Sequence, residues 1–389
     1  MGDEIIISSN VRNVKGVVLD QNAYPVMFVH VGVSEEGDID KNINEEREKI
    51  ADAVKLGANV ICDVSMHTNL EYVHKKLLEG FDVPFGVVTI YEAYINSQNK
   101  NLKVEEDEYI KIFEQEILRG FDIITIHATV FKDDRKLIAS TNRIVPTTSR
   151  GGMLMLELME KNGYENPFFT HFDKILKLCK KYNVCLSLGP CYRPGSVCDC
   201  SPDDELFKIE LERMAILVNK ANEAGVGIAI EGIGHAPLNQ IPNMIQAVRD
   251  KCGNAPYRCM TVATDIALGF DHISSAIASS MAIYSGADSI TCVSRSEHIG
   301  IPSKEETLEA VQATAIAIYS GYIARSNDFT LDRKMSMSRK KEGCIGDIST
   351  TLFPEQVKEI VKNKNSKKRG KSCSMCGSYC PLNSLEGEE

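Results

Sequence analysis

Residues 184–230, VCLSLGPCYRPGSVCDCSPDDELFKIELERMAILVNKANEAGVGIAI, contain the pattern that decides the fold. Two short apolar runs, Val184–Leu188 and Gly227–Ile230, flank a segment in which apolar residues recur every three or four positions. Ser201 offers an N-cap, followed by a proline and acidic residues suited to a first helical turn, and Gly225 ends the helix. The stretch therefore predicts one strand–helix–strand unit.

The same alternation recurs along the chain. Continuous apolar runs of this kind are typical of strands buried on both faces of a parallel sheet. Eight strand-then-helix units predict an α/β protein with a TIM-type (β/α)8 barrel, with a doubly wound sheet as the alternative. The eight runs are Met27–Val31, Asn59–Cys62, Phe85–Ile90, Asp122–Ile126, Val184–Leu188, Gly227–Ile230, Cys259–Ala263 and Ser289–Val293.

The pattern also predicts the domain boundaries. We expect an N-terminal segment over 1–24, a catalytic (β/α)8 barrel over 25–325, and a C-terminal arm over 326–389. Within the arm, the sequence predicts an irregular stretch over 325–350 and a short helix over Pro354–Lys362. The basic segment 362–371 then forms a linker.

Composition excludes several classes of protein. The 389 residues are 43% hydrophobic and 25% charged, which is typical of a globular protein. No apolar stretch is long enough for a membrane span, and the net charge of −10 argues against nucleic-acid binding. Charged residues surround the short run Ile5–Ile7, so we expect no signal peptide and a cytoplasmic protein.

Three of the thirteen cysteines stand close together near the end of the chain, in the CxxCxxxC motif of Cys373, Cys376 and Cys380. An odd total without an export signal disfavours a disulfide framework. Three thiolates can bind one iron–sulfur cluster and leave one iron free for a small molecule. Zinc is the main alternative, but it normally requires four ligands and no fourth Cys or His lies nearby in the sequence. A thiol-rich tail without metal is the third possibility.

Polar side chains stand where the predicted strands end, which is where barrel enzymes assemble their sites. Arg193 lies in a Pro/Gly turn and suits a phosphate or carboxylate, and Ser149–Gly152 precedes a helix and offers a second anion site. Together they predict a phosphorylated small substrate. His235 and His298 are candidates for a shared metal, with two unrelated polar residues as the alternative. The strand-end residues are His30, Asp63, Tyr91, His127, Arg193, Glu231, Asp265 and His298.

Ordered motifs resemble those of the phosphomethylpyrimidine synthase (ThiC) family, a radical S-adenosylmethionine (SAM) group of thiamine biosynthesis. The resemblance runs from about residue 25 to the end of the chain. The motifs are Thr170–Asp173, Leu186–Gly189 with Arg193–Gly195, Glu231–Pro237, Thr264–Ile273, Glu297–Pro302 and the cysteine motif. The resemblance implies an αβ barrel, and a radical SAM carbon–carbon lyase that rearranges aminoimidazole ribotide.

The resemblance also implies cofactors and partners. Cys373, Cys376 and Cys380 would hold a [4Fe-4S] cluster whose open iron binds SAM, and His235 and His298 would hold a divalent metal, zinc or iron. An external electron donor would be needed, and a homodimer or a paralogous heterodimer is expected. The implied catalytic residues are Glu231, Arg193 and His127. The implied substrate-binding residues are His30, Cys62, Tyr91, His127, Ser149, Arg150, Gly151, Gly152, Arg193, Glu231 and Tyr257.

Several departures from the family pattern concern the pocket. Cys62 stands where a methionine is typical, His30 where asparagine is typical, and Pro190–Cys191 replaces an Asp-Gly pair. The second gap of the cysteine motif has three residues where four are common. We therefore expect a paralogue that makes 5-hydroxybenzimidazole for the lower ligand of cobamides. The first alternative is the thiamine pyrimidine synthase, which makes hydroxymethylpyrimidine phosphate, and the second is a non-catalytic metal-binding partner subunit.

Overall fold

A computed structural model describes residues 5–100, 104–364, 373 and 375–384. The chain forms two compact units, Met1–Arg325 and Ser326–Glu389, and each is described by itself.

The first unit is a closed barrel of eight parallel strands, in the order β10-β3-β4-β5-β6-β7-β8-β9. Because β10 pairs with both β3 and β9, the TIM-type prediction is confirmed and the doubly wound sheet is excluded. All eight predicted runs form strands, although β8 extends beyond Ile230 to His235. The strands are β3 Val26–Val31, β4 Val60–Asp63, β5 Phe85–Val88, β6 Ile123–Ile126, β7 Cys185–Leu188, β8 Ile228–His235, β9 Tyr257–Val262 and β10 Ser289–Thr291.

The N-terminal segment adds a small antiparallel sheet of β1 (Ile5–Ile7) and β2 (Val17–Leu19). Ile7 and Leu19 are buried in one apolar cluster with residues such as Val60, near the starts of barrel strands. This sheet therefore covers the amino end of the barrel, opposite the end where barrel enzymes place their sites.

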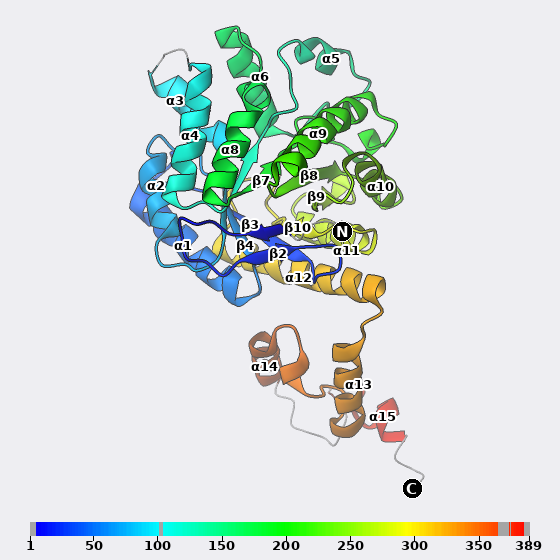
Figure 1. The fold of residues 1–389 in the computed structure, drawn as a ribbon. Helices are drawn as coiled ribbons and strands as arrows, with labels where there is room; N and C mark the ends of the chain where they lie inside the picture. Colours follow the sequence, from blue (N-terminus) through cyan, green and yellow to red (C-terminus); the bar gives the residue numbers. More distant parts are fainter. Residues whose placement is uncertain (1–4, 101–103, 365–372, 374, 385–389) are drawn as a thin grey trace. The chain divides into compact units, whose positions relative to one another are not determined.

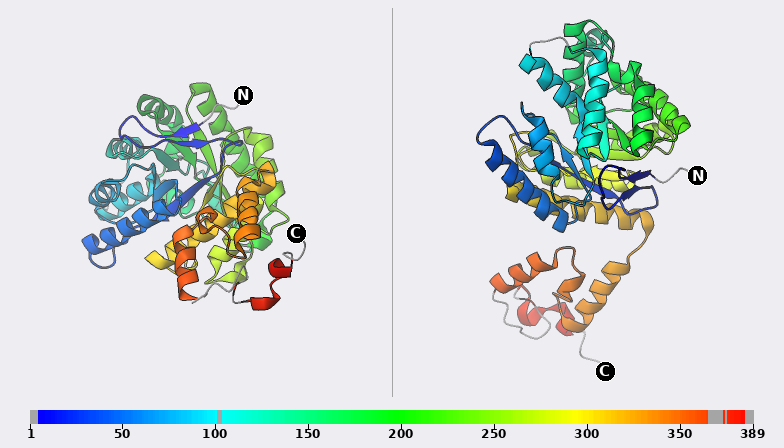
Figure 2. Two further views of the ribbon diagram at one scale, coloured as in Figure 1. Left: turned by 90° about the horizontal axis from the view of Figure 1, so that it is seen from below. Right: turned by 60° about the vertical axis from the view of Figure 1, so that its left-hand side comes forward.

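Helices surround the strands (Figures 1 and 2). They bury apolar stripes against the barrel, so the main core lies between the strands and the helices. They are α1 Ile39–Lys55, α2 Leu70–Leu78, α3 Thr89–Lys100, α4 Glu106–Arg119, α5 Asp134–Ser140, α6 Arg150–Asn162, α7 Pro167–Thr170, α8 Phe172–Tyr182, α9 Glu205–Ala224, α10 Ile241–Cys252, α11 Asp271–Tyr284 and α12 Lys304–Ser326.

Helix α9 corrects one prediction. Its N-cap is Asp204, whose carboxylate accepts a hydrogen bond of 2.8 Å from the amide of Phe207. Ser201 therefore stands in the turn before the helix and does not cap it. The end of the helix agrees with the prediction, since Gly225 forms the C-cap in the left-handed conformation.

The second unit contains α13 (Thr330–Glu342), α14 (Pro354–Asn363) and the short α15 (Pro381–Ser384). The short helix predicted from Pro354 is confirmed, but the irregular stretch predicted over 325–350 is wrong because α13 occupies much of it. Helix α13 buries none of its residues, so it has no apolar stripe for a sequence pattern to detect. Most of the predicted basic linker, 365–371, lies outside the described residues.

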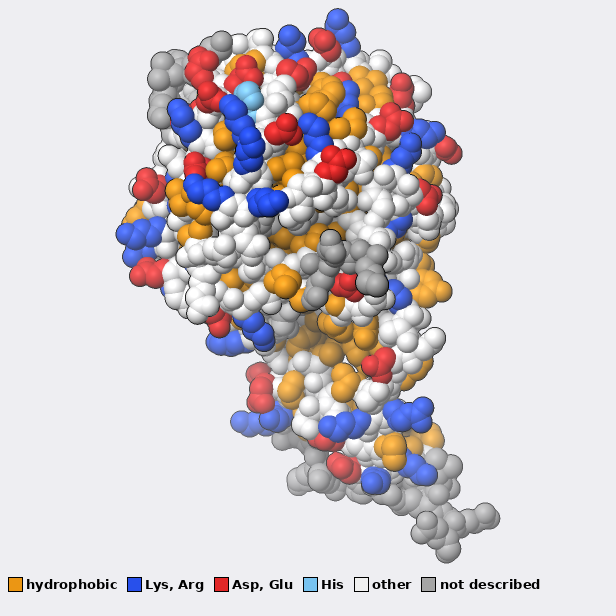
Figure 3. All heavy atoms as spheres, in the orientation of Figure 1, with side chains coloured by type: hydrophobic (Ala, Val, Ile, Leu, Met, Phe, Trp, Pro, Cys, Tyr) orange, Lys and Arg blue, Asp and Glu red, His pale blue; other side chains and the backbone are white. Residues whose placement is uncertain are grey.

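Two surface properties bear on partners. Over the face of the barrel seen in Figure 3, Lys and Arg side chains are interspersed with Asp and Glu. Among the described residues, no helix is both long enough and apolar enough to cross a membrane.

Candidate active site

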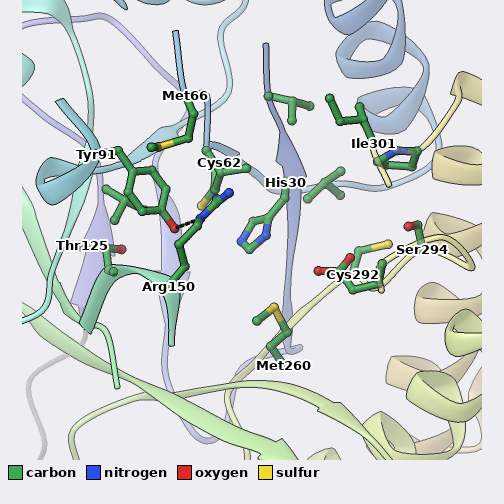
Figure 4. A pocket seen from close by; sticks show the side chains of 18 of the residues that line it. His30, Cys62, Met66, Tyr91, Thr125, Arg150, Met260, Cys292, Ser294 and Ile301 are labelled. Atoms are coloured by element: carbon green, nitrogen blue, oxygen red, sulfur yellow. Dashed lines mark hydrogen bonds between the residues drawn. The ribbon is translucent and has the colours of Figure 1, made fainter. Parts of the chain in front are cut away.

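A cavity of about 490 Å³ lies at the carboxyl ends of the barrel strands (Figure 4). Side chains in or just after all eight strands line it, as the barrel rule predicts. Of the residues predicted for the site, the structure brings eight together in its wall. They are His30, Cys62, Tyr91, His127, Arg150, Gly151, Arg193 and Glu231.

Glu231 is a fixed anion in this wall. Its Oε1 accepts hydrogen bonds from Ser187 Oγ at 2.7 Å and Thr125 Oγ1 at 2.9 Å, and it forms an ion pair with Arg258. Burial raises the pKa of Glu231, but the charge of Arg258 and these hydroxyl groups outweigh it and lower the pKa to about 2. The carboxylate therefore accepts hydrogen bonds at neutral pH and does not donate a proton.

Arg258 is the residue that sequence reasoning missed. The apolar run predicts a strand that begins at Cys259, whereas β9 begins at Tyr257 and pairs Arg258 directly with Glu231. The Arg258 guanidinium is almost fully buried, lies over the Phe28 ring and donates a hydrogen bond to Cys62 Sγ at 3.5 Å. A charged residue next to an apolar run was the only sequence feature that could have indicated it.

Two histidines in the wall are neutral. Burial, followed by the charge of Arg258, lowers the pKa of His30 to about 3. Burial also lowers the pKa of His127 to about 4, although Glu231 opposes the shift. Among the residues that the structure describes, none gives the buried His127 Nδ1 a hydrogen bond, so this atom is free to bind a ligand. A Cβ atom at Gly151 would lie 2.3 Å from His127 Cε1, so only glycine fits beside the imidazole.

Arg150 and Arg193 supply positive charge. Arg150 lies 4.5 Å from the centre of the Tyr91 ring and donates to its hydroxyl at 3.0 Å (Figure 4). Arg193 Nη2 makes only a long hydrogen bond of 3.5 Å, to Thr148 O. Within the described part of the chain, neither forms an ion pair with a carboxylate, so both guanidinium groups are free to bind an anion.

Several other predicted positions lie outside the cavity wall, among them Asp63, Ser149, Gly152, Cys191 and Tyr257. Ser149 Oγ accepts a hydrogen bond of 3.1 Å from Gly152 N, so Ser149 caps α6 and Gly152 packs against Cys191. Cys191 itself is fully buried. The expected anion site at this helix start is therefore reduced to Arg150 and Gly151, because the cap occupies the amide of Gly152. Tyr257 is also buried, and it lies beside residues of α9.

His235 and His298 meet in space, with their Nε2 atoms 3.2 Å apart. His235 Nδ1 lies 2.7 Å from Asp265 Oδ1, and His298 Nδ1 lies 3.2 Å from an oxygen of Asp271. A carboxylate on each Nδ1 leaves each Nε2 lone pair available, as in metal-ligating histidines. Two nitrogens at this separation fit one ion with metal–nitrogen bonds of about 2.1 Å. Among the described residues no group of three or more such side chains could hold an ion, so the pair offers two ligands.

The cysteine motif belongs to the second unit. The backbone amides of Cys376 and Met375 face the Cys373 sulfur and lower the pKa of that thiol. Amides directed at a thiolate are typical of iron–sulfur ligand loops, so the loop fits a cluster. A further thiol, Cys344, has its Sγ 3.4 Å from that of Cys380. Sequence spacing does not indicate this contact, because 36 positions separate the two residues.

Comparison with known proteins gives consistent matches. The model of the radical SAM ThiC family matches residues 1–387. The phosphomethylpyrimidine synthase of Carboxydothermus hydrogenoformans is 36% identical over 87% of this chain and 80% of the relative. That of Pyrococcus furiosus is 37% identical over 88% of this chain and 80% of the relative. A solved dihydropteroate synthase from Coxiella burnetii aligns with a TM-score of 0.48 at 14% identity, over 83% of this chain and 100% of that one.

Proposed function

This chain belongs to the radical SAM ThiC family, and on that premise we propose that it rearranges aminoimidazole ribotide. Family membership makes it a radical SAM enzyme with an iron–sulfur cluster. The observation that carries the choice of substrate is the charge arrangement of one cavity. Arg150 and Arg193, which form no ion pair with a carboxylate among the described residues, share its wall with the neutral imidazoles of His30 and His127.

Each of these groups suits one part of the ribotide. Arg150 and Arg193 bind the phosphate, because guanidinium groups pair with phosphate oxygens through two parallel hydrogen bonds. Glu231 stays ionised and accepts hydrogen bonds from the ribose hydroxyls or the ring amine. His127 offers its buried, unpartnered Nδ1 to the uncharged imidazole ring. The wall thus binds and orients the substrate through this chain's own side chains.

Two further sets of residues would hold inorganic cofactors. His235 and His298 would bind zinc or iron, with the carboxylates of Asp265 and Asp271 orienting the imidazoles. Cys373, Cys376 and Cys380 would bind the cluster. The chemistry that the cluster and SAM supply in this family is formation of a 5′-deoxyadenosyl radical, which abstracts hydrogen from the substrate.

Two products are candidates. The relatives are named phosphomethylpyrimidine synthases, which favours hydroxymethylpyrimidine phosphate, the alternative of the sequence analysis, over its main expectation. 5-Hydroxybenzimidazole remains the second candidate because of a specific observation. Cys62 and His30, which depart from the family pattern, both line the cavity, and Cys62 contacts the buried Arg258. The wall therefore differs where a substrate would lie.

The test is turnover by the full chain after anaerobic cluster reconstitution, with SAM, dithionite and aminoimidazole ribotide. We expect 5′-deoxyadenosine together with one of the two products, identified by mass spectrometry. Cys376→Ala should reduce 5′-deoxyadenosine to background. The matched control Cys198→Ala, at an exposed thiol of the barrel unit, should leave it within about twofold, as surface substitutions usually do.

The products decide between the candidates. Hydroxymethylpyrimidine phosphate alone would exclude the benzimidazole product, and 5-hydroxybenzimidazole alone would exclude the pyrimidine product. Absence of 5′-deoxyadenosine from a reconstituted protein would contradict the proposed activity. It would favour a metal-binding subunit of a paralogous heterodimer, which mixing with a paralogous chain would test.

A further inference from the structure

The thiols of this chain fall into two groups. Nine cysteines belong to the barrel unit, and all of them except Cys198 are buried. The other four are Cys344, Cys373, Cys376 and Cys380, all in the second unit. Three of these four form the CxxCxxxC motif, which leaves Cys344 without an assigned role.

Cys344 lies against the motif in space. Its Sγ is 3.4 Å from Sγ of Cys380, and the backbone of Cys373 also contacts the Cys344 thiol. A disulfide needs a sulfur–sulfur distance of about 2.05 Å, so the two sulfurs need to approach by only about 1.3 Å. The Cys344 thiol also forms a hydrogen bond with the side chain of Cys373, so it lies between two cysteines of the motif.

The backbone around Cys344 holds it in this place. It follows α13 in a tight turn, where Gly343 N donates to Arg339 O at 3.0 Å and Gly346 N donates to Gly343 O at 2.9 Å. Gly346 has a φ of +65°, a conformation that side chains disfavour, and a Cβ there would lie 2.8 Å from Arg339. The turn is therefore specified by its glycines and presents the thiol toward the motif.

The two sulfurs differ in exposure. Cys380 is 1% exposed, whereas Cys344 is partly exposed. An oxidant from solution therefore reaches Cys344 before it reaches Cys380, and the Cys380 thiol lies 3.4 Å away to complete the reaction. This order favours an intramolecular pair over cross-linking between molecules.

We propose that Cys344 and Cys380 form a reversible disulfide in the cluster-free protein, which withholds Cys380 from the metal site. The inference rests on the proposed function only in treating Cys380 as a cluster ligand. In the cell the oxidant would be a low-molecular-weight disulfide. The Cys344 thiolate attacks it and releases one small thiol, and Cys380 then displaces the second, so two protein thiols are oxidised and one small disulfide is reduced to two thiols.

The modification would protect the motif. Cysteine thiolates oxidise irreversibly beyond the sulfenic acid, whereas a disulfide is returned to two thiols by a thiol reductant. A chain that loses its cluster in air would therefore keep its ligands in a recoverable form. Reduction would release Cys380 and allow the cluster to be rebuilt.

The test treats the full cluster-free chain with diamide, which takes up two electrons and two protons to become the hydrazine. Peptide mapping by mass spectrometry without reductant should find Cys380 linked mainly to Cys344. Iron uptake in a later reconstitution should fall about tenfold, because a site of three thiols cannot form with one of them oxidised. Dithiothreitol should break the link between Cys344 and Cys380 and restore iron uptake.

Two variants serve as controls. Cys344→Ser should bind iron like the wild type when reduced and should lose most of the effect of diamide on iron uptake. Cys198→Ser, at an exposed thiol of the barrel unit, should behave as the wild type when reduced, after diamide and after dithiothreitol.

Three results would overturn the proposal: Cys380 linked mainly to Cys373 or Cys376, Cys380 left as a free thiol after diamide, or loss of iron binding by reduced Cys344→Ser. The last would make Cys344 a cluster ligand. The map needs neither SAM nor substrate, so failure of the proposed catalytic function would leave it unchanged.

Discussion

At the scale of single residues, the ion pair of Arg258 and Glu231 sets the electrostatics of the cavity. Both side chains are largely buried, and two hydroxyl groups supply further hydrogen bonds to the carboxylate. Such a pair adds little net stability compared with apolar residues, but losing one partner leaves an uncompensated buried charge. The pair therefore fixes the ionisation state of Glu231.

Arg258→Met should reduce the free energy of unfolding by about 3–5 kcal/mol, because it leaves the Glu231 carboxylate buried without its cation. The double variant Arg258→Met/Glu231→Gln should recover most of that loss, since no charge then remains unpaired. Chemical denaturation of the four proteins of this double-mutant cycle gives the coupling energy. Additive effects of the two substitutions would contradict the coupling.

The single variant Arg258→Met should also show a pH dependence of its unfolding free energy whose sign follows from the pKa of Glu231. In the wild type, the lowered pKa of Glu231 contributes stability above its unfolded pKa, and this is lost as the pH falls toward about 2. Without Arg258, burial raises the pKa of Glu231, so the folded variant takes up a proton as the pH falls from neutral. The difference in unfolding free energy between the two proteins should therefore narrow from pH 7 to pH 5, and a difference that widens would argue against this assignment.

At the scale of the element, the start of α9 joins a cap to an ion pair. Asp204 caps the helix through Phe207 N and also pairs with Arg143, whose Nη2 lies 2.6 Å from Asp204 Oδ2. The Arg143 side chain is 2% exposed, so the pair is shielded from solvent. Ser201 Oγ accepts a local hydrogen bond of 3.1 Å from Asp203 N and makes no contact with the first turn of α9 that would cap it.

Asp204→Ala should therefore cost more than the roughly 1 kcal/mol of an ordinary N-cap, since it also leaves the Arg143 guanidinium buried without its partner. Ser201→Ala, at the residue that the sequence predicted as the cap, should stay within about 0.5 kcal/mol of the wild type. Chemical denaturation measures both. Equal losses of unfolding free energy in Asp204→Ala and Ser201→Ala would contradict the assignment of Asp204 as the cap.

At the scale of the whole molecule, the barrel is complete within the first compact unit. Arg325, at the end of this unit, donates hydrogen bonds to the carbonyl oxygens of Ile283 and Ala287 at 3.1 and 3.0 Å. All eight strands, the helices around them and the cavity therefore belong to residues that precede α13.

A chain ending at Asn327 should consequently fold alone and melt cooperatively within about 5 °C of the barrel transition in the full chain, as expected of a domain with its own core. It should bind about tenfold less iron after reconstitution, since the three proposed cluster ligands are removed. Circular dichroism and iron analysis check the two expectations. A non-cooperative melt would contradict the independence of the unit, and unchanged iron would place the cluster elsewhere.

Much of the barrel and part of its site could be predicted from sequence. Periodicity identifies buried strands, and parallel strands place every polar residue that ends a strand at one edge, so His30, His127 and Glu231 were predicted together. Helix α13 was not predicted, because it buries no residues and so shows no apolar periodicity. Arg258 was not predicted because the predicted strand began at Cys259, two residues after the true start of β9, so the pairing of Arg258 with Glu231 was missed.

The sequence by itself determined the barrel, the family and the motif of three cysteines, because each depends on local pattern or on motif order. Only the tertiary structure decided which distant side chains touch. It brought His235 within 3.2 Å of His298, and Cys344 within 3.4 Å of Cys380. The physical reason is that contacts between distant residues arise from packing and chain closure, and no local periodicity records them.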